Sequence, residues 1–229
     1  MSMSLLISMD SGESDIVAHT LRRVGDKFDL VFIAHEEGVE AGELAEIILA
    51  AEGRIQLVSL PLIEGNPPEF RRRASFLGRS ISALSKAAED SDLAQSDKLV
   101  FLTGGTALIH CYGIEAIVNG MDKRGVGLAC AVAIGTDVNL DTLSDEQIER
   151  GERGGRMQSY DCKDFRPELF VVDKSVIALA TSFYYSVWTH RDYFKSIEQW
   201  LGECFRVNSF VFSDTAFGFT DGVIYDIRK

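Results

Sequence analysis

Polar residues follow three apolar stretches of the sequence that have the composition of buried β-strands. Ser8 to Asp10 follows the first stretch, Glu36 and Glu37 follow the second, and Thr103 to Thr106 follows the third. The carboxyl ends of parallel strands meet at one edge of a sheet, so we expect these groups to converge. Carboxylates at such an edge can accept hydrogen bonds from a base or a ribose. The pattern favours a ligand site here, and ordinary polar strand ends are the alternative.

The third of these segments reads Thr103-Gly104-Gly105-Thr106. It follows the expected strand 98–102, and an amphipathic pattern predicts a helix over 107–120 directly after it. The backbone amides of Gly104 and Gly105 would then lie at a helix start, where they could bind an anion. We therefore take this turn as a candidate phosphate site.

Strands and helices alternate in the first half of the chain. Apolar runs predict strands over 5–8, 29–34, 55–60 and 98–102, and helical spacing predicts helices over 16–24 and 40–52. A third helix, over 70–88, carries Arg71, Arg72, Arg73 and Arg79, the densest basic cluster of the chain. Its expected core face consists of residues spaced three and four apart: Phe70, Ala74, Leu77, Ile81, Leu84 and Ala88.

The second half has a different pattern. We expect strands over 126–134, 168–172, 209–212 and 223–227, and helices over 144–152, 175–188 and 193–205. The fold class is α/β: a Rossmann-like, mostly parallel sheet flanked by helices, with a mixed α+β C-terminal extension. We predict a single domain over 1–229, with a nucleotide-binding half over 1–135 and an acceptor-side extension over 136–229.

Composition limits the classes of partner. The chain has 229 residues and a net charge of −12, which argues against long nucleic acids and anionic membrane surfaces. Four widely spaced cysteines indicate free thiols in a reducing compartment. No signal peptide and no run long enough to span a bilayer are evident, so we expect a cytoplasmic protein. The sequence does not indicate an oligomeric state.

Several common catalytic motifs are missing. The sequence contains no P-loop, no H-E-x-x-H zinc motif and no G-x-S-x-G nucleophile elbow. The four histidines have no spacing typical of a metal site or a triad. No metal ligand is therefore assigned from the sequence.

The order of elements resembles that of GT-A glycosyltransferases, including the family 2 enzymes, over most of the chain. Asp29 to Glu37 resembles the second-strand segment whose terminal acid contacts the nucleotide base. The helix around Arg79 resembles the basic helix before the central strand, and Val100 to Leu102 resembles the strand that ends in the D-x-D motif. Pro167 to Ile177 resembles the acceptor-side strand and helix.

This resemblance implies a nucleotide-sugar-dependent glycosyltransferase that moves a sugar to an acceptor hydroxyl. A nucleotide-sugar donor and a glycan or lipid-linked acceptor are then the expected partners. The resemblance implies nucleotide-binding roles for residues at the strand ends and on the basic helix: Ser8, Asp10, Glu36, Arg79, Thr103, Gly104 and Gly105. Glu198 lies where such enzymes often carry the catalytic acid, and it would act as the general base in an inverting reaction.

The sequence departs from the family at the metal motif. Thr103-Gly104-Gly105 stands where D-x-D should hold a divalent cation, and hard cations require oxygen ligands, mostly carboxylates. Whether the protein uses a divalent cation as a cofactor is therefore left open by the sequence. One option is a metal-independent transferase that uses Arg71 to Arg73, Arg79 or helix amides. The other options are a metal held by other acids such as Asp137, and a fold that has lost catalysis.

Two other functions fit the same residues. Thr103 to Thr106 after an apolar strand also resembles the ligand loop of CARF domains, which sense cyclic oligoadenylates, although Ala107 replaces the usual lysine. A non-catalytic α/β binding module would explain the missing D-x-D without further assumptions.

Overall fold

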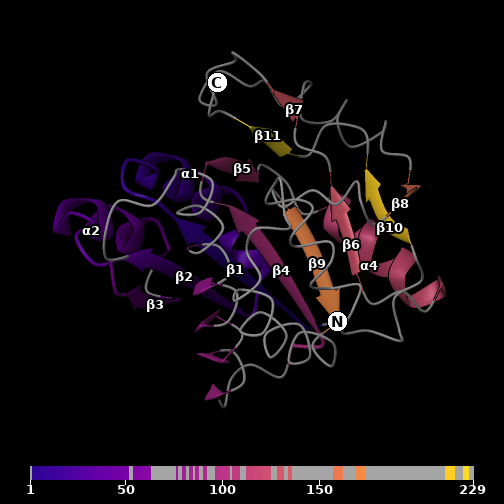
Figure 1. Cartoon of the computed structure of the whole chain (residues 1–229), viewed down its shortest axis with the longest axis horizontal. Helices are drawn as coiled ribbons and strands as arrows, with labels where there is room; N and C mark the ends of the chain where they lie inside the picture. Colours follow the sequence, from indigo (N-terminus) through magenta and orange to yellow (C-terminus); the bar gives the residue numbers. More distant parts are fainter. Residues whose placement is uncertain are drawn as a thin grey trace, which may run out of the picture.

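The computed structural model (Figure 1) describes residues 2–51, 54–62, 76, 79–80, 83–84, 86–87, 90–91, 96–103, 105–108, 112–124, 128–131, 134–135, 157–161, 169–173, 215–219 and 224–226. Its central feature is an eight-stranded sheet with the strand order β3-β2-β1-β4-β9-β6-β10-β8. The sheet is Rossmann-like, mostly parallel and flanked by helices, as the sequence predicts.

The first four strands of this sheet are parallel. They are β1 (Met3–Met9), β2 (Leu30–Glu36), β3 (Ile55–Leu60) and β4 (Lys98–Thr103). β1 lies between β2 and β4, and β3 pairs with β2. All residues of β1 are buried, because both faces of a central parallel strand are covered. The four predicted strands are confirmed, and β3 has the predicted bounds.

The second half of the chain contributes to the same sheet. β9 (Leu169–Asp173) lies between β4 and β6 (Leu128–Ala131) and runs antiparallel to both. β10 (Thr215–Phe219) runs parallel to β6, and β8 (Met157–Asp161) runs antiparallel to β10. The prediction of a strand over 168–172 is confirmed by β9. The sequence analysis missed β8 and β10, whose pairing partners lie far away in the sequence.

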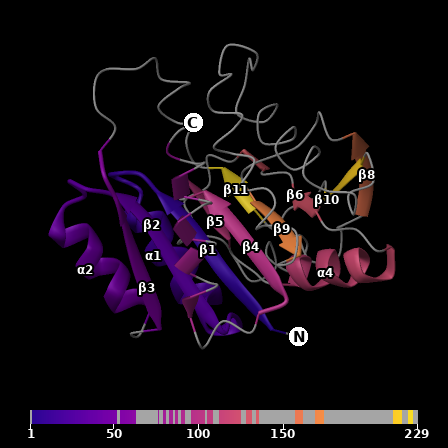
Figure 2. The same cartoon turned by 60° about the horizontal axis from the view of Figure 1, so that its bottom comes forward.

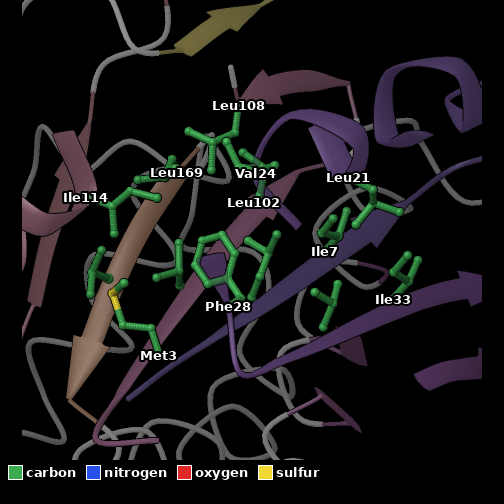
Figure 3. Packing of buried hydrophobic residues seen from close by; sticks show 14 of the residues in the cluster. Met3, Ile7, Leu21, Val24, Phe28, Ile33, Leu102, Leu108, Ile114 and Leu169 are labelled. Atoms are coloured by element: carbon green, nitrogen blue, oxygen red, sulfur yellow. The ribbon is translucent and has the colours of Figure 1, made fainter. Parts of the chain in front are cut away.

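Helices α1 (Ser14–Val24), α2 (Ala41–Ala50) and α4 (Tyr112–Arg124) are the three whose bounds the structure gives. Alternate residues of the strands pack with α1, α2 and α4 in one apolar cluster, shown in Figure 3. Ile7 and Leu102 are at most 2% exposed within it. Helix α1 passes at Gly25 into a short 3-10 turn (Gly25–Lys27), and α2 ends before the predicted residue 52.

Helical residues are also described at positions 76, 79–80, 83–84, 86–87 and 90. Phe76, Ser80 and Leu84 are at most 6% exposed and stand four residues apart, which places them on one face of a helix. The prediction that Leu84 belongs to the core is confirmed. On the neighbouring strands, the rings of Phe101 and Phe170 stack with their centroids 4.7 Å apart.

A second sheet has three short strands, in the order β5-β11-β7. They are β5 (Thr106–Leu108), β11 (Ile224–Asp226) and β7 (Ile134–Gly135). The strand predicted over 126–134 is confirmed in part by β6, but it is not a single strand, because β7 belongs to the other sheet. The strand predicted over 223–227 is confirmed by β11. The elements predicted over 144–152, 175–188, 193–205 and 209–212 lie outside the described residues.

A buried lysine fixes the amino end of β4. Lys98 Nζ lies 2.9 Å from Asp122 Oδ1 on α4 and 2.9 Å from Asp173 Oδ2 on β9, and the lysine side chain is 8% exposed. Burial alone lowers the pKa of Lys98. Hydrogen bonds to both carboxylates and their negative charges outweigh this effect and raise the pKa above its usual value of 10.5.

Candidate functional site

The predicted polar residues at the strand ends lie at one edge of the sheet. Ser8 of β1 stands in register with Thr103 of β4 on one side and with Ala34 of β2 on the other. Glu36 ends β2, and Asp10 directly follows β1. Neighbouring strands in a sheet are about 4.8 Å apart, so these residues line a continuous edge. The structure brings together Ser8, Asp10, Glu36 and Thr103.

Arg79 is joined to this edge by Glu36. Arg79 Nη2 lies 3.1 Å from Glu36 Oε1, and Arg79 Nη1 donates a hydrogen bond to the carbonyl oxygen of Pro61, just after β3. The Arg79 and Glu36 side chains are 23% and 14% exposed. The guanidinium group therefore connects the ends of β2 and β3 to the helix that carries it. This contact fixes the orientation of the Glu36 carboxylate.

The turn between β1 and α1 is also held in place. The amide of Asp10 donates to Glu13 Oε2 at 2.8 Å, and the amide of Gly12 donates to Glu43 Oε1 on α2 at 2.9 Å. Gly12 has a φ of +83°, a conformation that side chains with a Cβ atom rarely adopt. Glycine at this position allows its amide to face α2. The sequence analysis missed the role of Glu43, whose only signal was its position in the first turn of α2.

The turn after β4 differs from the prediction. Thr106–Leu108 forms strand β5, and helix α4 begins only at Tyr112. The predicted helix over 107–120 therefore starts too early, and no helix start stands next to Gly105. The binding of an anion by the amides of Gly104 and Gly105 stays a prediction. Gly105 is buried, Thr106 is 1% exposed, and Gly104 lies outside the described residues.

The remaining predicted residues cannot be placed relative to this edge. Glu198, Arg71 to Arg73 and Asp137 all lie outside the described residues. Within the part of the chain that the structure describes, no group of three or more His, Cys, Asp or Glu side chains could hold a metal ion. The described strand ends do not form a metal site made only of protein ligands.

A groove of about 560 Å³ lies at the opposite edge of the sheet. Its walls come from the last turns of α1 and α2 and from the first residues of β2 and β3, including Leu21, Val31 and Ile55. None of the predicted site residues lines it. The groove is therefore separate from the edge that carries Ser8 and Glu36.

Within the described part of the chain, every helix is too short or too polar to span a bilayer. No protein-family model matches the sequence, and no curated protein matches it. Solved structures do match. The S. aureus TarS structure "in complex with UDP-GlcNAc" has a TM-score of 0.52 and 7% sequence identity, over 100% of this chain and 59% of TarS.

Two further solved structures match with lower scores. Mannosyltransferase PcManGT from Pyrobaculum calidifontis, "in complex with GDP-Man and Mn2+", has a TM-score of 0.47 and 12% identity over 77% of this chain and 45% of that protein. Galactosyltransferase LgtC, with donor and acceptor sugar analogs, has a TM-score of 0.48 and 13% identity over 88% of this chain and 70% of LgtC.

The chain spans about half the length of PcManGT and TarS. At 7% identity the similarity to TarS concerns the fold alone. The chain therefore has a Rossmann-like fold of the GT-A type found in glycosyltransferases such as TarS.

Proposed function

We propose that this protein is a nucleotide-sugar-dependent glycosyltransferase that moves a sugar to an acceptor hydroxyl. The observation that carries the proposal is the convergence of Ser8, Asp10, Glu36 and Thr103 at the carboxyl edge of a GT-A-type sheet. Ligands of open α/β sheets bind at this edge. TarS, which has a similar fold, was solved with UDP-GlcNAc, and this supports a nucleotide-sugar as the donor class.

Glu36 is the residue we assign to the base or ribose of the nucleotide. Its Oε1 atom accepts from Arg79, so the arginine holds the carboxylate in one orientation. A carboxylate held in this way can accept an N–H of a base or a hydroxyl of a ribose. Arg79 is accordingly a positioning residue for Glu36, and its guanidinium group is already engaged by two oxygen atoms.

Glu198 is the general base in this proposal. A carboxylate near the acceptor would remove the proton of the attacking hydroxyl as the bond to the sugar forms. A glycan or a lipid-linked sugar would supply that hydroxyl. A cytoplasmic location and the acceptor-side role of residues 136–229 stay predictions.

The first test is binding of nucleotide-sugars, measured as thermal shifts with UDP-, GDP- and dTDP-sugars, with and without Mn²⁺. A ligand at a concentration of a hundred times its Kd adds about 2.7 kcal/mol to the free energy of unfolding. The correct donor should therefore raise the melting temperature clearly. Glu36→Gln should reduce this shift. Glu40→Gln, an exposed acid four residues further along, is the matched control.

Two outcomes would contradict the proposal. The absence of a thermal shift with every nucleotide-sugar would show that the protein has no donor site. A shift with cyclic oligoadenylate alone would favour the sensor function that the Thr103 to Thr106 segment also resembles.

A further inference from the structure

Strand β3 is the first strand in the order of the large sheet. Among the described residues it pairs only with β2, and this pairing extends over the whole strand. Figure 2 shows β3 and α2 at the outer end of the sheet. Natural edge strands usually carry a charged residue, a proline or a bulge that prevents pairing with another chain. Ile55–Leu60 contains no charged residue and no proline, and its register with β2 has no bulge. The composition and regularity of β3 therefore favour pairing with a further strand.

The backbone groups of β3 that face away from β2 can be identified. The carbonyl oxygen of Leu60 accepts a hydrogen bond from the amide of Glu37, directly after β2, at 2.8 Å. The backbone groups of Leu60 therefore point toward β2. Successive residues of a paired strand direct their backbone groups to opposite sides. Leu57 and Ser59 accordingly direct their amides and carbonyl groups outward, and the Ser59 side chain is also exposed.

Complementary groups lie at the two ends of β3. Arg54 precedes the strand and Glu37 lies beside its end, and neither side chain has an ion pair among the described residues. The start of β3 also lines the groove of about 560 Å³, together with Leu49 of α2, which is 80% exposed. Leu62, just beyond the other end, is 59% exposed. One end therefore presents a cation and an apolar groove, and the other presents an acid and an apolar side chain.

An antiparallel pair of two β3 strands brings these unlike ends together. In such a pair, the start of each strand lies beside the end of the other. Arg54 of one copy then approaches Glu37 of the other copy, and Leu62 of that other copy approaches the groove. A two-fold axis forms both contacts twice. The complementarity of the two ends is the reason for choosing a second copy of this chain as the partner.

We propose that the protein forms a homodimer in which two β3 strands pair antiparallel and extend the sheet across both copies. The two-fold axis is perpendicular to the sheet, because residues that stand opposite in an antiparallel pair share one face. Helix α2 of each copy then lies on the same face of the joined sheet. The inference is independent of the proposed function, since it uses none of the residues assigned to the nucleotide.

The first test removes one outward backbone donor. Sedimentation equilibrium over a range of protein concentrations gives the mass in solution and the dimer Kd, and the wild type should have twice the mass of one chain. Ser59→Pro removes an outward amide and leaves the hydrogen bonds to β2 in place, so the dimer Kd should rise by about tenfold or more. Ser59→Ala keeps the amide and is the matched control. An unchanged circular dichroism spectrum shows that the proline variant is folded.

The second test identifies which ends of the strands meet. Arg54→Glu and Glu37→Arg each place like charges together in the dimer, so each should raise the dimer Kd by about tenfold. The double variant restores opposite charges and should return the Kd to near the wild-type value. The two positions stand at opposite ends of β3 in one chain, about 20 Å apart, so the rescue can only arise between copies.

Three results would overturn the proposal. The first is a wild-type protein with the mass of one chain at every concentration. The second is a folded Ser59→Pro variant whose dimer Kd equals that of Ser59→Ala. The third is a double charge variant whose dimer is as weak as those of the single variants.

Discussion

Arg79 and Glu36 form an ion pair with 3.1 Å between Nη2 and Oε1, which connects the helical residues 79–80 to the end of β2. Both side chains are less than one quarter exposed. The degree of burial of this pair is therefore intermediate between that of an exposed surface ion pair and that of a fully buried one. Its coupling energy should be about 1 kcal/mol, because solvent screens it only in part.

A double-mutant cycle of Glu36→Gln and Arg79→Met tests the positioning role of Arg79. Each single variant should raise the Kd for the nucleotide, and the double variant should be little worse than Glu36→Gln alone. Titration calorimetry with UDP and GDP provides the measurement. Fully additive losses would show that Arg79 contacts the nucleotide itself. Arg22→Met is the control, since its exposed pair with Glu46 is remote from this edge.

Lys98 should contribute strongly to stability. Lys98→Met leaves Asp122 and Asp173 without their shared cation, and we expect the free energy of unfolding to fall by about 2–3 kcal/mol. Urea denaturation measures this change. Lys27→Met is the matched control: Lys27 also pairs with an aspartate, at 3.0 Å from Asp26, but both side chains are more than half exposed. It should cost less than about 1 kcal/mol. Equal losses would contradict the buried role of Lys98.

The raised pKa of Lys98 predicts a loss of stability at alkaline pH. A lysine whose pKa is higher in the folded state than in the unfolded state contributes stability that is fully present below its usual pKa of 10.5. That contribution disappears as the pH rises through the folded-state pKa. The free energy of unfolding of the wild type should therefore approach that of Lys98→Met above about pH 10.5. A constant difference between the two proteins up to pH 12 would contradict the raised pKa.

Glu198→Gln tests the general base. The amide has nearly the same shape as the carboxylate but cannot accept the proton, so kcat should fall by about 10²–10⁴-fold while the nucleotide Kd stays nearly the same. Steady-state kinetics and calorimetry give the two values. Glu203→Gln, in the same predicted helix, is the control. Unchanged turnover in Glu198→Gln would remove this residue from the mechanism.

The sequence is a good guide to the strands whose partners are close in the chain. The strand over 55–60 has the same bounds in the prediction and in the structure, because an apolar run ends at Pro61. By contrast, β8 and β10 pair with each other across more than fifty residues, and nothing in their local composition indicates this. The helix predicted over 107–120 is confirmed from Tyr112 on by α4, and its predicted start is wrong for the same reason. Thr106 to Leu108 forms a strand because β11, far along the chain, pairs with it.

The candidate site, too, could be predicted from the sequence only in part. Ser8, Glu36 and Thr103 could be grouped from the sequence, since the ends of parallel strands share an edge. The contact between Glu36 and Arg79 could not be predicted, because it depends on how the helix packs on the sheet. The second acceptor of Arg79 is the backbone carbonyl of Pro61, which has no signal in the sequence.

The position of β9 between β4 and β6 has a consequence during protein synthesis. Lys98 and its partner Asp173 are separated by 75 residues, so β4 has a neighbour on only one side until residue 173 has left the ribosome. Until then the nascent chain exposes an apolar strand edge, which favours pairing with other chains. The sheet closes late in translation, and an interrupted polypeptide that stops before residue 169 should aggregate.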